Sequence, residues 1–148
     1  MYARLRSRSR SGAAVVEAAF VLLAFLLILF GIIEYCRFLF LQQLITNAAR
    51  EGARYAVVNT ADPTLDADTT AVVTQAMIGQ DAKLTNFTIR VYQADPNGVN
   101  DGQASDAQFG QYIAVQIDGD YKPFLPTFLF MNQTIHMTTK SLMCSEAN

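Results

Sequence analysis

The stretch that decides the fold is AAVVEAAFVLLAFLLILFGII, residues 13–33, in which Glu17 is the one charged side chain. About 20 apolar residues carry a helix across the roughly 30 Å hydrocarbon layer of a membrane. After Glu17 this stretch is apolar on every side, whereas the surface helix of a soluble domain shows a single apolar stripe. We therefore predict a transmembrane helix over 13–33 and not the core helix of a soluble domain.

Basic residues indicate how this helix is oriented. Four arginines and no acidic residue precede it within residues 1–12. An excess of basic residues marks the cytoplasmic end of a membrane helix. We expect a single-pass protein with its N-terminus in the cytoplasm and residues 34–148 as an extracytoplasmic domain. A cleaved secretory signal peptide is the alternative, but its apolar region is usually about 7–15 residues, and GIIEYCRF contains no small-residue cleavage site.

The helix is expected to continue past the membrane to about residue 58. Residues 34–58 contain no proline. Their apolar and small residues recur at spacings of three and four, which places them on one face of a helix. A shorter second helix is predicted over 62–79, with Asp62 as its N-terminal cap, Pro63 at its first position and Gly79 at its end.

After residue 80 the apolar residues alternate, which is typical of half-buried strands. We predict strands over 86–93 and 111–121, and a third over 133–143. The polar stretch ADPNGVNDGQASDAQFG, residues 94–110, is predicted to be a loop because it is rich in turn-forming residues. The expected fold class is α+β, with a long N-terminal transmembrane-plus-amphipathic helix packed on a small antiparallel sheet.

Glu17 is the most informative single residue, because an acid at the centre of a bilayer costs about 3 kcal/mol. One interpretation is that its side chain reaches the cytoplasmic headgroups. The surrounding pattern offers another, since a basic segment and Gly12 precede four apolar residues and then Glu17. This pattern resembles the cleavage region of type IV prepilins, which implies that a prepilin peptidase cuts between Gly12 and Ala13. Glu17 of one subunit would then neutralise the new Ala13 ammonium group of a neighbour, because buried charges are tolerated when paired.

Residues 9–58 closely resemble the N-terminal half of TadE-like proteins, which are minor pilins or pseudopilins of the tight-adherence (Flp-type) pilus. The most characteristic part is AAREGARYAV, residues 48–57. The resemblance implies a bacterial inner-membrane protein, in contact with lipid, whose partners are prepilin peptidase, the major pilin, TadF-like pseudopilins and the inner-membrane platform. It also implies a pilin-like fold. One departure is Ala18, since an aromatic residue commonly follows the glutamate in this family.

The segment 48–57 is expected to pack against other subunits. Its small residues, Ala48 and Gly52 among them, would let another backbone approach closely. The charged residues Arg50, Glu51 and Arg54 would reach a partner subunit. The alternative is a solvated face with a local ion pair between Glu51 and Arg54.

Other candidate sites are weaker. Cys36 and Cys144 could form a disulfide in an oxidising compartment. No zinc site is expected, because His136 is the single histidine. The apolar segment 122–131 is expected to be a lid under the sheet, with a contact patch for a partner or lipid as the alternative. Oxygen ligands for calcium occur in the polar loop, although turn chemistry explains them more simply; they are Asp95, Asn97, Asn100 and Asp101.

We expect neither catalysis nor a cofactor, because the sequence offers no catalytic triad, paired acids or glycine-rich phosphate loop in a supporting context. The formal charge of −2 becomes −6 once residues 1–12 and their four arginines are removed. This acidic balance does not favour nucleic-acid binding. The alternative to a pilus protein is an uncleaved, membrane-anchored extracytoplasmic binding or sensor domain.

Overall fold

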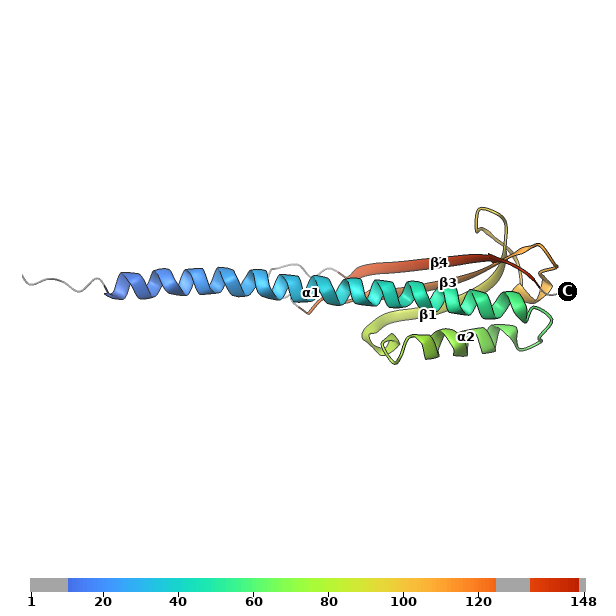
Figure 1. Cartoon of the computed structure of the whole chain (residues 1–148), viewed down its shortest axis with the longest axis horizontal. Helices are drawn as coiled ribbons and strands as arrows, with labels where there is room; N and C mark the ends of the chain where they lie inside the picture. Colours follow the sequence, from blue (N-terminus) through green and yellow to red (C-terminus); the bar gives the residue numbers. More distant parts are fainter. Residues whose placement is uncertain (1–10, 125–133, 147–148) are drawn as a thin grey trace, which may run out of the picture.

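The computed structural model describes residues 11–124 and 134–146. The arginines of the leader, most of the predicted lid and the first residue of the third predicted strand lie outside the described residues. A single helix, α1 (Ser11–Val58), runs along the molecule, and the remaining elements gather around its C-terminal half (Figure 1).

Helix α1 is continuous over 48 residues. At about 1.5 Å per residue it is about 70 Å long. Its interior lacks proline, and its long apolar and small residues favour a helix over a strand. The prediction of one unbroken helix through both the apolar and the amphipathic segment is confirmed.

Helix α2 (Leu65–Ala76) is shorter than the predicted 62–79. Asp62 does not cap it, because Asp62 Oδ1 accepts hydrogen bonds from the backbone N–H and the hydroxyl of Thr64, at 2.9 and 2.7 Å. Asp62 thus shapes the turn before the helix, and Pro63 lies in that turn. After the helix, Ile78 and Gly79 have positive φ angles of 50° and 71°. The predicted role of Gly79 near the helix end is consistent with this, since glycine adopts such angles without strain.

The sheet has four antiparallel strands in the order β2-β1-β3-β4. The three predicted strands are confirmed with shifted ends, and they are β1 (Leu84–Ala94), β3 (Tyr112–Tyr121) and β4 (Ile135–Cys144). The short strand β2 (Asn100–Gly102) was not predicted. It lies in the polar loop and pairs with Gln93 and Ala94 at the end of β1. Two short 3-10 helices, Asp81–Lys83 and Ala104–Asp106, complete the part of the molecule that folds around the C-terminal half of α1. We call this part the head.

The hydrophobic core lies between the helices and one face of the sheet. Helix α1 packs on β3 and β4, and α2 packs on α1 and β1. Alternate residues of β3, including Val115 and Ile117, point into this core and are fully buried. Leu41, Ile45 and Ala49 of α1 meet them from the other side. The expected α+β class, with a helix covering the apolar face of an antiparallel sheet, is confirmed.

Candidate assembly surface

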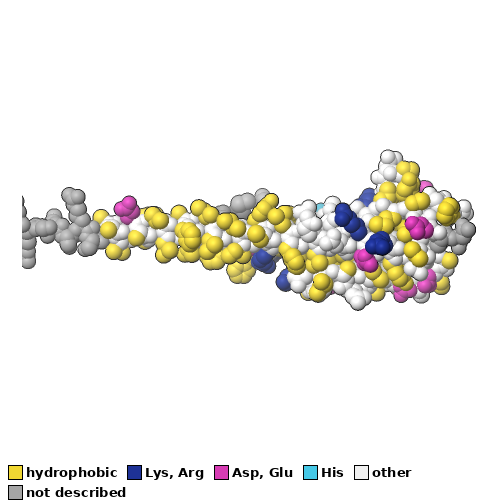
Figure 2. Space-filling view, in the orientation of Figure 1, with side chains coloured by type: hydrophobic (Ala, Val, Ile, Leu, Met, Phe, Trp, Pro, Cys, Tyr) yellow, Lys and Arg dark blue, Asp and Glu magenta, His cyan; other side chains and the backbone are white. Residues whose placement is uncertain are grey.

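The N-terminal half of α1 is apolar and uncovered. Phe20, Phe25 and Ile28 are 69%, 58% and 65% exposed. Figure 2 shows this half as a mostly apolar rod, with most charged side chains over the head. Of the helices in the described part of the chain, α1 is long and apolar enough to cross a membrane, and its most apolar stretch is not buried. Apolar surface of this extent needs lipid or other apolar helices to cover it.

Gly12 and Ala13 lie in the first turn of α1, and both are exposed. A Cβ atom added to Gly12 would meet no other atom within 4 Å. Nothing else in the described part of the chain therefore packs against Gly12.

Glu17 is exposed on the same helix, about 6 Å along the axis from Ala13. It makes no ion pair with another described residue. A carboxylate on an apolar helix surface is costly in lipid unless a partner neutralises it. Its charge is thus available to a group on another molecule.

Glu34, which the sequence reasoning missed, ties the end of the apolar stretch to the head. Its carboxylate accepts hydrogen bonds from the Tyr121 hydroxyl and from the Phe124 backbone N–H, the latter at 3.1 Å. Arg37 lies 3.4 Å from its other oxygen, and the rings of Phe38 and Tyr121 are 5.8 Å apart. Burial, followed by the negative Glu34, raises the pKa of Tyr121 to about 12. The available signal was an acid directly after an apolar run.

Ala48 and Gly52 are buried inside this chain. A Cβ atom on Gly52 would lie 2.4 Å from Cγ2 of Val73 in α2 and 3.4 Å from Val115 in β3. The expectation that these two residues face another subunit is therefore wrong. Their small size lets α2 and the sheet approach α1 within the same molecule.

Arg50, Glu51 and Arg54 are exposed on the outer side of α1. Among the described residues, no ion pair joins Glu51 to Arg54. Both line a groove of about 690 Å³ between α1 and α2, together with Tyr55 and residues of α2. These charged side chains remain available to a partner.

Comparison with known protein families matches the apolar half of α1 and most of its packed half. Residues 12–54 match the TadE-like protein family. The match confirms the resemblance and indicates a role in the tight-adherence pilus system. The matched segment runs from Gly12 through the uncovered half of α1 to Arg54 in the head. No curated protein and no solved structure matches the chain.

Cys36, in the TadE-like segment, and Cys144 are both free and exposed. Tyr121 pairs with Ile135 at one end of β4, and Tyr112 pairs with Cys144 at the other. Because the Tyr121 hydroxyl donates to Glu34, Cys36 of α1 lies toward the Ile135 end of β4. The ten residues of β4 span about 30 Å at about 3.3 Å per residue. A disulfide needs Cα atoms within about 7 Å, so the disulfide that the sequence left possible cannot form within one chain.

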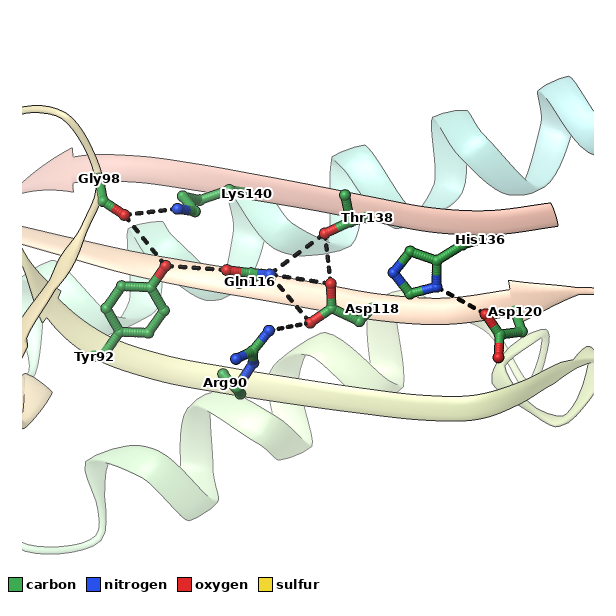
Figure 3. A network of polar contacts seen from close by, with 9 residues as sticks. All are labelled: Arg90, Tyr92, Gly98, Gln116, Asp118, Asp120, His136, Thr138 and Lys140. Atoms are coloured by element: carbon green, nitrogen blue, oxygen red, sulfur yellow. Dashed lines mark hydrogen bonds and ion pairs between the residues drawn. The ribbon is translucent and has the colours of Figure 1, made fainter.

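The sheet face turned away from α1 is polar (Figure 3). Asp118 on β3 lies at its centre and accepts hydrogen bonds from Thr138, from Gln116 at 3.0 Å and from Arg90 at 2.6 Å. Burial disfavours the charged form of Asp118, but these hydrogen bonds outweigh it and hold the pKa of the carboxyl below its usual value. The network joins β1, β3 and β4, which makes it structural.

The polar loop is fastened to this face. Lys140 Nζ donates to the carbonyl oxygen of Gly98 at 2.6 Å. Asp95 Oδ1 accepts from the backbone N–H groups of Asn97 and Val99 at 2.9 and 2.7 Å. Turn chemistry therefore uses this carboxylate, as the simpler interpretation of the loop expected. No group of three or more metal-ligating side chains occurs in residues 11–124 and 134–146.

Proposed function

We propose that the protein is a minor pilin or pseudopilin needed to assemble a tight-adherence, Flp-type (type IVc) pilus. The observation that carries this proposal is the extent of the TadE-like match, residues 12–54. That segment contains the uncovered apolar half of α1, its isolated acid and the helix face on which the head folds. The work of such a subunit is non-covalent: its helices stack and its head is presented outside the membrane.

In this proposal prepilin peptidase cleaves the bond between Gly12 and Ala13. The bond lies in the first turn of α1, and a glycine within a helix costs about 1 kcal/mol relative to alanine. Helix ends also fray. Opening this turn to an extended substrate conformation is therefore cheap. Cleavage removes the basic leader and places an ammonium group on Ala13.

Glu17 then neutralises that ammonium group on a neighbouring subunit. Between Ala13 and Ile33 no other side chain is charged, so a neighbouring apolar helix offers no competing partner. An unpaired buried charge is strongly unfavourable. Helices stacked out of register would leave both charges unpaired, so the pair selects one register of assembly.

The proposed location is the bacterial inner membrane, with the N-terminus in the cytoplasm, the head outside and later incorporation in the pilus. The proposed partners are prepilin peptidase, the major pilin, TadF-like pseudopilins, the inner-membrane platform and lipid. Arg50, Glu51 and Arg54 are the head residues proposed to contact a neighbouring subunit. The support for this is the exposure of all three side chains, the place of Glu51 and Arg54 in the lining of the groove, and the absence of ion pairs between the three and other described residues.

Replacement of Glu17 tests the pairing directly. We expect Glu17→Ala and Glu17→Gln to insert in the membrane and to be cleaved, because both keep the helix and the glycine. Both should abolish piliation, because both remove the charge that pairs with the Ala13 ammonium group. Glu17→Gln is the sharper variant, since it keeps the size of the side chain. Asp101→Asn is the matched control, because Asp101 is an exposed acid in the short strand β2. Normal piliation with Glu17→Gln would contradict the charge pairing.

A further inference from the structure

We propose that Phe124 and Lys122, the described head residues next to Tyr121 and its bond to Glu34, form with Tyr35 and Arg37 of α1 a second membrane contact that lies in the outer headgroup layer. The partner is the phospholipid surface of the bilayer that α1 crosses. This inference rests on the proposed membrane insertion of α1. It assigns a lipid contact to the head itself, at its membrane-proximal end.

The position of Glu34 along α1 places this contact at the membrane edge. Glu17 and Glu34 are separated by about 26 Å of helix, at about 1.5 Å per residue. The hydrocarbon layer is about 30 Å thick. When Glu17 lies near the cytoplasmic edge, Glu34 therefore lies near the opposite edge. The head residues bonded to Glu34 must then lie at that surface too.

Hydrogen bonds fix these head residues to α1 at this level. The Glu34 carboxylate accepts from the Tyr121 hydroxyl and the Phe124 N–H, and Arg37 lies 3.4 Å from it. A carboxylate near hydrocarbon is costly unless donors replace its water. Three donors from the chain do so here. The same bonds hold the backbone of Phe124 against α1.

The exposed side chains around Glu34 have the composition of a membrane interface. Phe124 is 82% exposed and Tyr35 is 62% exposed. Arg37, three residues after Glu34, and Lys122, directly after Tyr121, are exposed cations. Aromatic rings gather at the headgroup level, and long basic side chains near the end of a membrane helix reach it with their charge. An exposed phenylalanine at this level gains free energy by entering the layer.

Tryptophan fluorescence tests the proposal, because the sequence contains no tryptophan. Each of Phe124→Trp, Phe25→Trp and Phe109→Trp then carries a single fluorophore. Phe25 lies midway along the apolar half, whereas Phe109 is 68% exposed in the loop before β3. The full chain is reconstituted in vesicles of phosphatidylcholine and phosphatidylglycerol that carry bromine at shallow or deep acyl positions.

We expect a blue-shifted emission from Phe124→Trp, with stronger quenching by shallow than by deep bromine. Phe25→Trp should be quenched most by deep bromine, and Phe109→Trp should not be quenched. If Phe25→Trp is quenched and Phe124→Trp behaves like Phe109→Trp, the proposed contact is wrong while the membrane helix stands. If Phe25→Trp is not quenched either, the membrane insertion itself is wrong and both proposals fail.

A second substitution tests the role of Glu34. Adding Glu34→Ala to Phe124→Trp should shift the emission to the red and reduce quenching, because the tie to the Phe124 backbone is lost. Adding it to Phe25→Trp should leave quenching unchanged, which shows that the helix remains inserted. Unchanged quenching of Phe124→Trp in the Glu34→Ala background would contradict the proposed tie.

Discussion

Tyr121 donates its hydroxyl hydrogen to Glu34 and joins the end of β3 to α1 across a separation of 87 residues. This contact lies where the head begins along the helix. On one side of it lies the uncovered apolar half that the TadE-like match includes, and on the other side lies the packed core. The bond thus lies at the boundary between the uncovered apolar half of α1, which needs lipid or partner helices, and the packed head.

Tyr121→Phe should destabilise the head. It leaves the partly buried Glu34 with one hydrogen-bond donor fewer, and a hydrogen bond to a charged group contributes about 1.5–3 kcal/mol. The free energy of unfolding is measured by urea titration of the full chain in detergent micelles, followed by circular dichroism. Tyr35→Phe is the control, because Tyr35 is 62% exposed. Equal stability of the two variants would contradict the structural role of the bond.

Alkaline pH should weaken the same contact. The pKa of Tyr121 is raised to about 12, chiefly by burial and then by Glu34. An unfolded tyrosine has a pKa of about 10. The stabilisation is therefore complete below pH 10 and is lost as the pH rises toward 12. Stability measured over this range should fall more in the wild type than in Tyr121→Phe, and parallel curves would count against this assignment.

Gly52→Ala should destabilise the packing of α2 on α1. Alanine favours a helix over glycine by about 1 kcal/mol. The added Cβ would lie 2.4 Å from Cγ2 of buried Val73, however, and overpacking costs about 1–3 kcal/mol. We expect the clash to dominate and the midpoint of urea unfolding to fall.

Two variants isolate the cause of this effect. Gly31→Ala is the matched control, since its added Cβ meets nothing within 4 Å. Val73→Ala combined with Gly52→Ala should recover part of the loss, because it removes the atom in the way. A Gly52→Ala protein as stable as Gly31→Ala would show that the approach of α2 is not tight.

Asp118→Asn should weaken the polar face of the sheet. Hydrogen bonds to a charged group contribute about 1.5–3 kcal/mol. The Arg90 bond adds little to this, because the Arg90 side chain is 60% exposed. Urea unfolding at neutral pH should give a lower free energy of unfolding for Asp118→Asn than for the wild type. The control, Asp101→Asn, should unfold like the wild type.

The acid response of Asp118→Asn provides an independent check. Because the folded-state pKa of Asp118 is lowered, its stabilisation is present above about pH 4 and is lost as the pH falls further. Asp120 has a lowered pKa as well, through His136 and Asn86. The wild type should therefore lose more stability on acidification than Asp118→Asn, which keeps the Asp120 contribution. Identical acid curves would remove Asp118 from this account.

The sequence predicted the elements whose side-chain period is strong. The apolar run of 13–33 indicated the uncovered helix half, and alternation indicated β1, β3 and β4. Asp62 was misplaced because short polar side chains bond equally well in turns and at helix starts. Small residues such as Gly52 indicate a close approach but not the approaching partner. Glu34 was missed because its partner, Tyr121, lies 87 residues away in the sequence. Without that contact, the sequence does not show that Cys36 and Cys144 lie at opposite ends of β4.

The most direct test of the central claim is the N-terminal residue of the protein purified from membranes, with and without the host's prepilin peptidase. The account predicts Ala13 as the N-terminus when the peptidase is present and the intact arginine-rich leader when it is absent. An intact leader in both strains would contradict it. Glu17 would then have no Ala13 ammonium group to neutralise, and a permanently anchored binding or sensor domain would be the better interpretation.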